Sequence, residues 1–393
     1  MQTDGNLLIL QAMIKKRVFS QVNWIDGMKI SKDHFIQSEN NLVELIQDAA
    51  ALNLNSYNYG LLPAEDGEGE SLELEVLQVG NGSIKSRLAL CRAVTSGGCR
   101  IELSGELRKE VVSENFKIDN RKEAVYFIIV SANYTRRIPV GIPDPNEVPA
   151  RHPHVIEDYT LSILSEDDMN ANQLGANHLP IGRIVNKAGE WLLDKDYIPP
   201  CTSVVSHRLL VKIYKVLGKQ FFEISNCALR VVQKVVSRGQ TSSLALNVKA
   251  FSFAIASSFG QEVLHLRHIA YNHPPLLLIE KYYRLVSGIS LNLEALPVKE
   301  RDDMVAYFAE LLEIRPVDIN ELITQVLEIE YDHTDCFNSL VPVQSFSNIF
   351  ASLFEKLDKR EEIGKRVERD LFIRSTVETE QPKPKRKPNI FLE

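Results

Sequence analysis

The chain has 393 residues, which is enough for two or three domains with sizeable buried cores. Apolar residues make up 44% and charged residues 25%, an ordinary composition for a soluble globular protein. The net charge of -7 argues against non-specific nucleic-acid binding, which needs a cationic surface. No run approaches the ~18 to 20 uncharged apolar residues of a membrane span.

The N-terminus and the cysteines bear on the cellular compartment. Leu7–Ile14 is apolar but short, and the basic Lys15–Arg17 follow it, whereas a signal peptide carries its charges before the apolar region. Residues 1–17 are therefore interpreted as a short arm. The five cysteines are scattered and odd in number, which favours free thiols in a reducing compartment. The expected location is the cytoplasm.

A turn and a helix are predicted next. Asp26-Gly27 is a turn dipeptide between apolar flanks. Ser31 is placed to cap a helix over residues 32–52, whose apolar residues recur at helical spacing. Trp24 and Phe35 have two interpretations, as anchors for a partner or as parts of the local core.

From residue 72 to about 197 the pattern is typical of β-structure. Short apolar runs are separated by turn signals at Gly80–Gly82, Gly97-Gly98 and Pro139–Pro153. No helical pattern lies between them, which favours an antiparallel sandwich or barrel-like domain that ends at Pro199-Pro200. The predicted strands cover residues 72–77, 84–93, 99–107, 124–131, 159–164 and 179–185.

From residue 203 to about 357 the pattern is helical and predicts an α-helical bundle. Pro342 is expected to interrupt the last helix. A charged helix is expected from Lys359 to about Phe372, and the proline-rich basic segment up to Glu393 is expected to be a disordered tail. The predicted helices cover residues 203–236, 243–270, 299–312, 317–329 and 335–357, with one more that starts at Pro274 or Pro275.

The first of these helices carries a long apolar stripe. Its period of 3.5 residues keeps one face turned toward a partner over a length of about 40 Å. The partner is either other helices of this chain or further copies of it. The stripe consists of Leu210, Tyr214, Leu217, Phe221, Ile224, Ala228, Val231 and Val235.

No catalytic constellation emerges. Gly218-Lys219 lacks the remaining residues of a phosphate-binding loop, and no Gly-x-Ser-x-Gly or Cys-x-x-Cys is present. His152-x-His154 has a spacing used by metal ligands, but it lies in a proline-flanked loop. Glu262-x-x-His265 resembles half of a di-iron site, but the chain has no second Glu-x-x-His. We therefore expect no enzyme activity, no cofactor and no metal.

Three separated stretches resemble the TssK family, the trimeric baseplate subunit of the type VI secretion system. The first is Trp24-Ile-Asp-Gly27-Met28 with His34-Phe35-Ile-Gln37 and Tyr59-Gly60-Leu61, although Ser31-Lys32-Asp33 departs from the usual family pattern before the histidine. The second is His273-Pro274 leading into Tyr282–Gly288. The third is Tyr331-Asp-His-Thr-Asp335 leading into Phe337. Together they span roughly residues 18 to 360.

The resemblance implies a non-enzymatic structural adaptor. It implies a β-sandwich like the shoulder of siphophage receptor-binding proteins, a helical neck and a homotrimer whose contacts are the stripe residues. The implied partners are the wedge subunits TssF and TssG, and the membrane complex by a route that remains to be found. The family's C-terminal head has no counterpart here, so another subunit or the tail would dock on the membrane complex. The candidate partner-binding residues are Trp24, Gly27, Met28, His34 and Phe35.

The expected organisation has four parts. They are an arm over 1–17, a shoulder domain over 18–200, a neck over 201–358 and the charged helix and tail over 359–393. Two other function classes stay open. A phage-tail-like receptor- or carbohydrate-binding protein would share the shoulder fold, and a bundle oxidase would bind iron or manganese.

Overall fold

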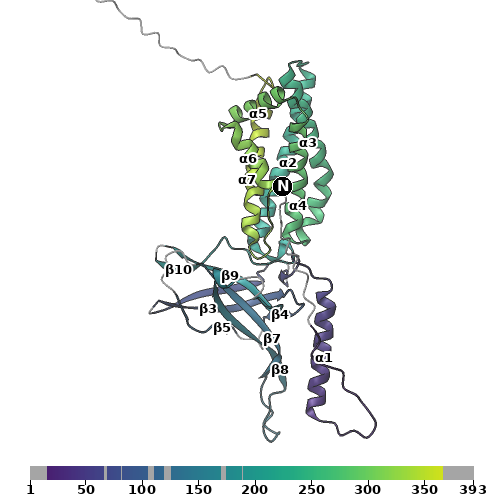
Figure 1. Cartoon of the computed structure of the whole chain (residues 1–393), viewed down its shortest axis with the longest axis vertical. Coiled ribbons are helices and arrows are strands. Elements are labelled where there is room, and N and C mark those ends of the chain that lie inside the picture. Colours follow the sequence, from purple (N-terminus) through teal and green to yellow (C-terminus); the bar gives the residue numbers. More distant parts are fainter. Residues whose placement is uncertain are drawn as a thin grey trace, which may run out of the picture.

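The computed structural model describes residues 16–65, 69–80, 82–104, 110–118, 125–169, 174–187 and 189–365. A β region lies at one end of a helical region, and a separate helix, α1 (Lys32–Ala51), stands beside the β region (Figure 1). Most of the predicted arm, and the tail beyond residue 365, lie outside the described residues. Within the described part of the chain, no helix is long and apolar enough to cross a membrane.

The β region contains two antiparallel sheets. In the first, β3 is the central strand, and the other five strands pair with different parts of it. The second has the order β10-β9-β7-β8. The strands of the first sheet are β1 (Gly60–Leu61), β2 (Leu72–Val79), β3 (Ser83–Val94), β4 (Arg100–Leu103), β5 (Val111–Val112) and β6 (Phe116–Lys117). Those of the second are β7 (Tyr126–Val140), β8 (His154–Ser165), β9 (His178–Lys187) and β10 (Glu190–Leu193).

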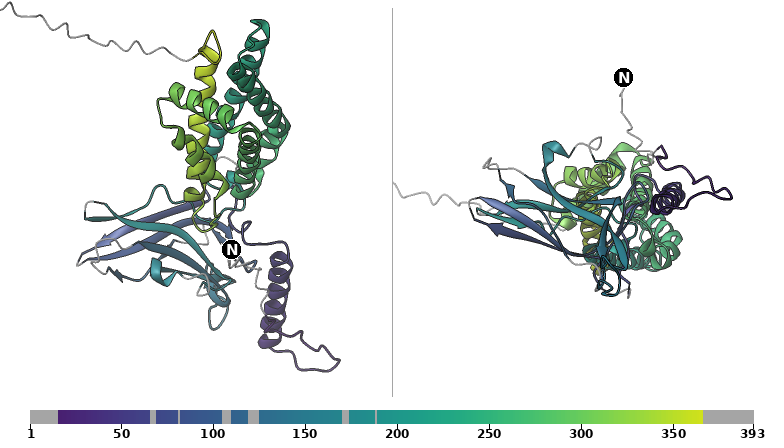
Figure 2. Two further views of the ribbon diagram at one scale, coloured as in Figure 1. Left: turned by 45° about the horizontal axis from the view of Figure 1, so that its top comes forward. Right: turned by 90° about the horizontal axis from the view of Figure 1, so that it is seen from below.

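The antiparallel β-structure predicted from the sequence is confirmed, with two kinds of difference. Strands β7 and β8 extend well beyond their apolar runs and form a hairpin that projects from the sheet (Figure 2). Its outer residues are exposed or half-buried and mix polar with apolar side chains, so no regular alternation marks them as strand. Four short strands, β1, β5, β6 and β10, were not predicted, because two to four residues are too few for a period to show.

Six α-helices form the helical region. Buried side chains of both sheets and of these helices form one continuous apolar core. The six helices predicted between residues 203 and 357 are present, with boundaries that differ by a few residues. They are α2 (Arg208–Ser237), α3 (Ser243–His268), α4 (Pro275–Glu294), α5 (Val298–Leu312), α6 (Pro316–Leu327) and α7 (Cys336–Lys359).

Helix α7 corrects two predictions at the C-terminal end. It passes through Pro342 without interruption. Burial of the neighbouring Leu340, Val343 and Phe346 stabilises the helix by more than the roughly 3 kcal/mol that an internal proline costs. The charged helix predicted from Lys359 does not begin within residues 360–365, which form an extended residue and a turn after the end of α7, and the rest of that prediction, residues 366–372, lies outside the described residues.

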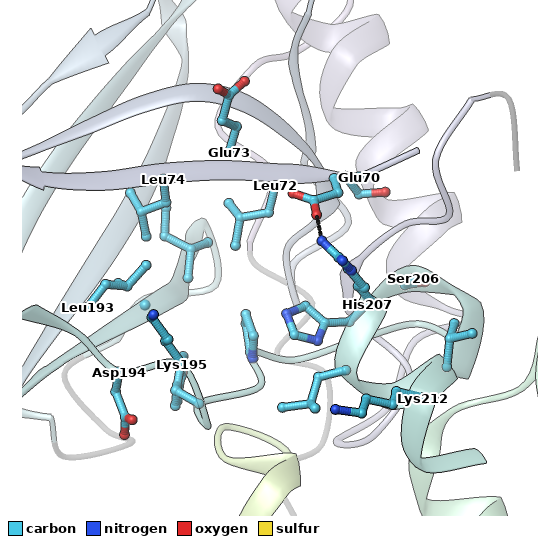
Figure 3. A pocket seen from close by; sticks show the side chains of 18 of the residues that line it. Glu70, Leu72, Glu73, Leu74, Leu193, Asp194, Lys195, Ser206, His207 and Lys212 are labelled. Carbon is cyan, nitrogen blue, oxygen red and sulfur yellow. Dashed lines mark hydrogen bonds and ion pairs between the residues drawn. The ribbon is translucent and has the colours of Figure 1, made fainter. Parts of the chain in front are cut away.

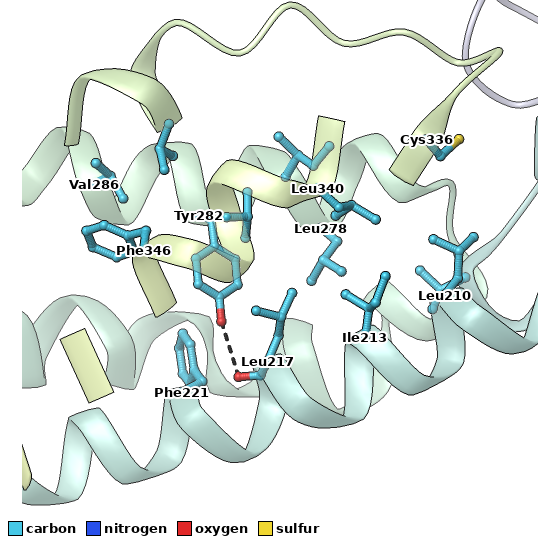
Figure 4. Packing of buried hydrophobic residues seen from close by; sticks show 14 of the residues in the cluster. Leu210, Ile213, Leu217, Phe221, Leu278, Tyr282, Val286, Cys336, Leu340 and Phe346 are labelled. Atoms are coloured by element: carbon cyan, nitrogen blue, oxygen red, sulfur yellow. Dashed lines mark hydrogen bonds between the residues drawn. The ribbon is translucent and has the colours of Figure 1, made fainter. Parts of the chain in front are cut away.

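The long stripe of α2 is buried inside this one chain. Seven of its eight residues are at most 1% exposed, and Tyr214 is partly buried and donates its hydroxyl proton to the carbonyl of Leu266. Figure 4 shows Leu210, Leu217 and Phe221 facing side chains from α4 and α7. Tyr282 of α4 donates to the carbonyl of Leu217 at 3.2 Å. The assignment of these positions to contacts between copies is therefore wrong, and the alternative of neighbouring helices in the same chain is correct.

Candidate functional site

An apolar surface lies on α1 and the segment that precedes it. Trp24 is 50% and Phe35 57% exposed, and their ring centroids are 6.3 Å apart. His34 lies 6.1 Å from the Trp24 ring, edge to face. We call this surface the arm patch, and its exposed apolar residues are Trp24, Ile25, Ile30, Phe35, Leu42 and Ile46.

Helix α1 is inverted relative to an ordinary surface helix. Its buried residues are mainly polar, Asn40, Asn41 and Glu44, while Leu42 and Ile46 point away from the protein with Phe35. Residues 35, 42 and 46 lie within about 40° of one another around the helix axis. An apolar face of this kind is typical of a surface that a partner covers.

Hydrogen bonds from Val18 and Phe19, which lie before the turn at Gly27, fix this segment to the buried polar face of α1. The Glu44 carboxylate accepts from the amides of Val18 and Phe19, the second at 2.9 Å. Asn41 donates to the carbonyl of Phe19 at 2.7 Å. Arg137 of β7 binds Glu39 and Asn40, which fixes α1 to the projecting hairpin. These contacts orient the apolar face outward.

The five predicted partner-binding residues have different roles. Trp24, His34 and Phe35 lie together, as described. Gly27 occupies the predicted turn with φ of 79°, a conformation that favours glycine, and Met28 is half-buried beside it. The His34 imidazole accepts from the backbone amide of Ser31 at 3.1 Å and so stabilises the start of α1. Partner binding by these five residues stays a prediction.

The other motif stretches meet at the junction between the β region and the helical region. Leu61 donates to the carbonyl of Pro200 at 2.7 Å, and the amide of Val204 donates to the carbonyl of His273 at 2.9 Å. Gly60 has φ of 114°, and a Cβ there would overlap the Pro200 carbonyl. The glycine of Tyr59-Gly60-Leu61 therefore permits a close approach of two backbones.

His333 connects the two regions through both ring nitrogens. Nε2 donates to the carbonyl of Tyr59 at 2.8 Å, and Nδ1 accepts from the hydroxyl of Tyr331 at 2.7 Å. The side chain is buried, and burial lowers its pKa to about 4, so the ring is neutral at pH 7. The Tyr-x-His-x-Asp stretch thus serves the joint between the two regions.

Asp335, at the start of α7, forms a second connection. Arg183 of β9 binds Asp335 and also Asp194, whose carboxylate lies 2.7 Å from the guanidinium. Burial raises the pKa of Asp335, against the opposing effect of Arg183. Asp335 occupies the N-cap position of α7, but its side chain binds Arg183 and Asn338 and accepts no capping hydrogen bond. Arg183 and Asp194 carried no sequence signal.

A large cleft of about 1130 Å³ lies between β2, the segment after β10 and the start of α2 (Figure 3). Arg208 and Glu70 form an ion pair of 3.3 Å across its edge. His207 lines the cleft, its Nδ1 has no hydrogen-bond partner within the described part of the chain, and burial lowers its pKa to about 4. Cations and carboxylates both line this cleft, so its charge selects no single class of ligand.

The residues considered for metals and nucleophiles have structural explanations. The Glu262 carboxylate lies 3.3 Å from the ammonium of Lys281 and forms an ion pair with it. His152 bonds the carbonyl of Gly141. No cluster of three metal-ligating side chains exists among the described residues. All five cysteines are buried and none forms a disulfide with another described residue, and burial raises the pKa of Cys91 and Cys336 to about 12, which keeps these two thiols protonated.

Residues 134–293 match the family model described as bacterial type VI secretion, VC_A0110, EvfL, ImpJ, VasE. A crystal structure of TssK is 16% identical, with a TM-score of 0.50 over 86% of this chain and 69% of that one. A chain in the structure of the TssK-TssF-TssG baseplate subcomplex is 14% identical in sequence, with a TM-score of 0.45 over 85% of this chain and 99% of that one. A chain in the structure of the baseplate complex from the type VI secretion system is 16% identical, with a TM-score of 0.47 over 85% of this chain and 100% of that one.

No curated protein matches the chain. The family match covers the C-terminal half of the β region and the first helices of the helical region, and the crystal structure of TssK has the same fold. The chain therefore resembles the TssK family of type VI secretion baseplate proteins, in its sequence over residues 134–293 and in its fold.

Proposed function

We propose that the chain is a non-enzymatic adaptor of the baseplate and that its arm patch binds wedge subunits of the TssF and TssG type. The observation that carries this proposal is the inverted helix α1, with aromatic and aliphatic residues exposed and Glu44 buried. Aromatic residues dominate the energy of protein interfaces. TssK is named together with TssF and TssG in a baseplate subcomplex, and the match of residues 134–293 to the family model supports the same partners for this chain.

The proposed architecture follows the family. Residues 18–200 form a β-sandwich shoulder, 201–358 a helical bundle neck, 1–17 an arm and 359–393 the C-terminal segment. The adaptor acts in the cytoplasm, and its contact with the membrane complex is made through another subunit or the C-terminal segment.

The test of partner binding is capture of TssF and TssG from the same secretion system, co-expressed with the full chain. Trp24→Ala with Phe35→Ala removes two exposed rings, and we expect at least a tenfold loss of capture, since each such anchor contributes about 2 kcal/mol or more. Tyr283→Ala with Leu291→Ala is the matched control, because both side chains are exposed on α4. Normal capture by the first variant would reject the arm patch, and no capture by the wild type would reject the adaptor function.

A homotrimer is also part of the proposal, through a face other than the buried stripe. Leu246, Phe253 and Leu264 share one exposed face of α3, and Leu229 and Val236 are exposed on α2, which packs against α3. These side chains form an apolar surface that further copies would cover.

Light scattering of the purified chain tests the trimer. We expect a mass three times the 44.5 kDa of one chain. Phe253→Asp with Leu264→Asp should reduce the mass to that of one chain and leave the helical circular dichroism unchanged. A wild-type protein that stays monomeric with and without wedge proteins would overturn the trimer.

A further inference from the structure

A second cleft, of about 550 Å³, lies at the junction between the β region and the helical region. Phe127, Glu166 and Arg183 line it from the β region, and the segment from Gln325 to Pro342 lines it from α6, α7 and their connection. We call it the acidic cleft. Its lining contains five carboxylates and a single cation, Arg183, and the carboxylates are Glu166, Glu328, Glu330, Asp332 and Asp335.

The negative charge of the acidic cleft is not neutralised within the described part of the chain. Arg183 is already bound to Asp194 and Asp335. The other four carboxylates of the lining form no ion pair with any described residue. Like charges at this density repel one another, so a cationic ligand would lower the electrostatic free energy of the site.

Asp335 supplies a second observation. The residue is 8% exposed, and its Oδ2 accepts from Arg183 and Asn338. Its Oδ1 is buried and has no hydrogen-bond partner among the described residues. A buried carboxylate oxygen without a donor costs about 1 to 3 kcal/mol or more. The site therefore lacks a donor, in addition to lacking positive charge.

The chain itself contains a matching cation. Lys383, Lys385, Arg386 and Lys387 lie within five positions, between Pro382 and Pro388. Prolines favour an extended backbone that loses little conformational entropy on binding. Four cations in an extended segment suit a cleft whose uncompensated carboxylates lie on both of its walls.

The connection is long enough. Lys365 lies at the far end of the helical region, where the amide of Ile363 donates to Gln240 just beyond the end of α2. Helix α7 has 24 residues, so the acidic cleft at its N-terminus is about 36 Å from that end. The 18 peptide steps from residue 365 to 383 reach up to about 60 Å.

We propose that the segment Lys383–Lys387 binds in the acidic cleft of its own chain and connects the β region to the end of the helical region. Tethering supports a segment of the same chain over a free peptide, because a linker of this length gives an effective concentration of about a millimolar. Weak individual ion pairs then suffice. The proposal is independent of the wedge partners and of the trimer.

Carbodiimide cross-linking of the full chain tests this binding, because the reagent joins a lysine to a carboxylate only when the two are in contact. We expect cross-links from Lys383, Lys385 or Lys387 to Glu328 and Glu330. Their yield should fall about tenfold between 0.1 and 0.5 M salt, where screening shortens the range of the attraction. Cross-links spread evenly over surface carboxylates, or none from this segment, would overturn the proposal.

Charge reversal makes the test specific. Glu328→Lys with Glu330→Lys should abolish these cross-links, and both positions are exposed, so the fold is retained. Adding Lys383→Glu, Lys385→Glu, Arg386→Glu and Lys387→Glu should restore cross-linking. The new cross-links would join the amines introduced at positions 328 and 330 to the carboxylates introduced at positions 383 to 387. The matched control is Glu313→Gln with Glu321→Gln, two exposed carboxylates outside the cleft, which should leave the yield unchanged.

Isotope mixing separates binding within a chain from binding between chains. Chains labelled with ¹⁵N are mixed and reassembled with unlabelled chains before cross-linking. Cross-linked peptides that are uniformly labelled or unlabelled support the proposal. Mixed pairs at the statistical frequency would overturn it in favour of a segment from a neighbouring copy.

Discussion

Helices α1 and α2 carry similar apolar patterns, yet one pattern is exposed and the other is buried. In α2 the residues at heptad spacing are at most 1% exposed apart from Tyr214. In α1 the corresponding residues Phe35, Leu42 and Ile46 are all more than half exposed. The difference teaches that an apolar stripe indicates a covered face, whereas its length and period do not indicate which chain covers it.

The surroundings of the two helices explain the difference. Helix α2 packs against α3 and α7 along its length, and α4 reaches it through Tyr282. Helix α1 meets the rest of the protein through its polar face, where Arg137 binds Glu39 and the backbone amide of Phe19 donates to Glu44. Its apolar face meets no other helix of the described chain.

The largest expected effect is on the α2 stripe. Leu217→Asp with Ile224→Asp places two carboxylates in the core, and we expect a loss of at least about 5 kcal/mol of stability, enough to unfold the helical region. Circular dichroism against temperature measures it. A folded double variant whose only change is a smaller mass would show that the stripe does join copies.

Gly60→Ala tests the junction between the β region and the helical region. The added Cβ overlaps the Pro200 carbonyl at a positive φ, so we expect a loss of about 3 kcal/mol or more. Gly239→Ala is the control, because Gly239 also has a positive φ but open space around it, and its cost should stay near 1 kcal/mol. Equal losses in denaturant unfolding would show that the close approach is unimportant.

His333→Ala should cost about 2 to 3 kcal/mol at pH 8, because in a buried site it removes the nitrogen that accepts from the Tyr331 hydroxyl and the N–H that donates to the Tyr59 carbonyl. The pKa of His333 is about 4 in the folded chain and about 6.5 in the unfolded chain. The unfolded state therefore binds more protons between these values, and stability falls as the pH drops from about 6.5 to 4.

The difference in unfolding free energy between the wild type and His333→Ala should therefore become smaller as the pH drops over the same range. The wild type loses stability there because the imidazole of its unfolded state takes up a proton, whereas the variant has no imidazole at this position. Unfolding in denaturant at pH 8, 6 and 4.5 measures both proteins. The raised pKa of Asp335 acts in the opposite direction in both, so their difference isolates His333. A pH-independent difference would contradict the neutral buried imidazole.

The smallest effect on stability is expected for α1. Leu42→Ser with Ile46→Ser replaces side chains that are already exposed, so the unfolding free energy should change by about 0.5 kcal/mol or less. The same variant should lose capture of TssF and TssG. A large loss of stability would show that this face is covered within the chain, as in α2.

The sequence by itself determined the order of elements and most of their types. Ser31 marked the start of α1, Asp26-Gly27 the turn before it, and alternating apolar runs the antiparallel strands, because caps, turns and periods are properties of neighbouring residues. The separated motifs were also sufficient to indicate the TssK family.

Only the tertiary structure decided which faces meet. The pairing of Arg183 with Asp335 joins residues 152 positions apart, and Gly60 matters because Pro200 lies over it. Burial of Phe221 and exposure of Phe35 follow from the neighbours of each helix, not from the residues themselves. Long-range contacts of this kind leave no local pattern, because the free energy that selects them belongs to the packed chain as a whole.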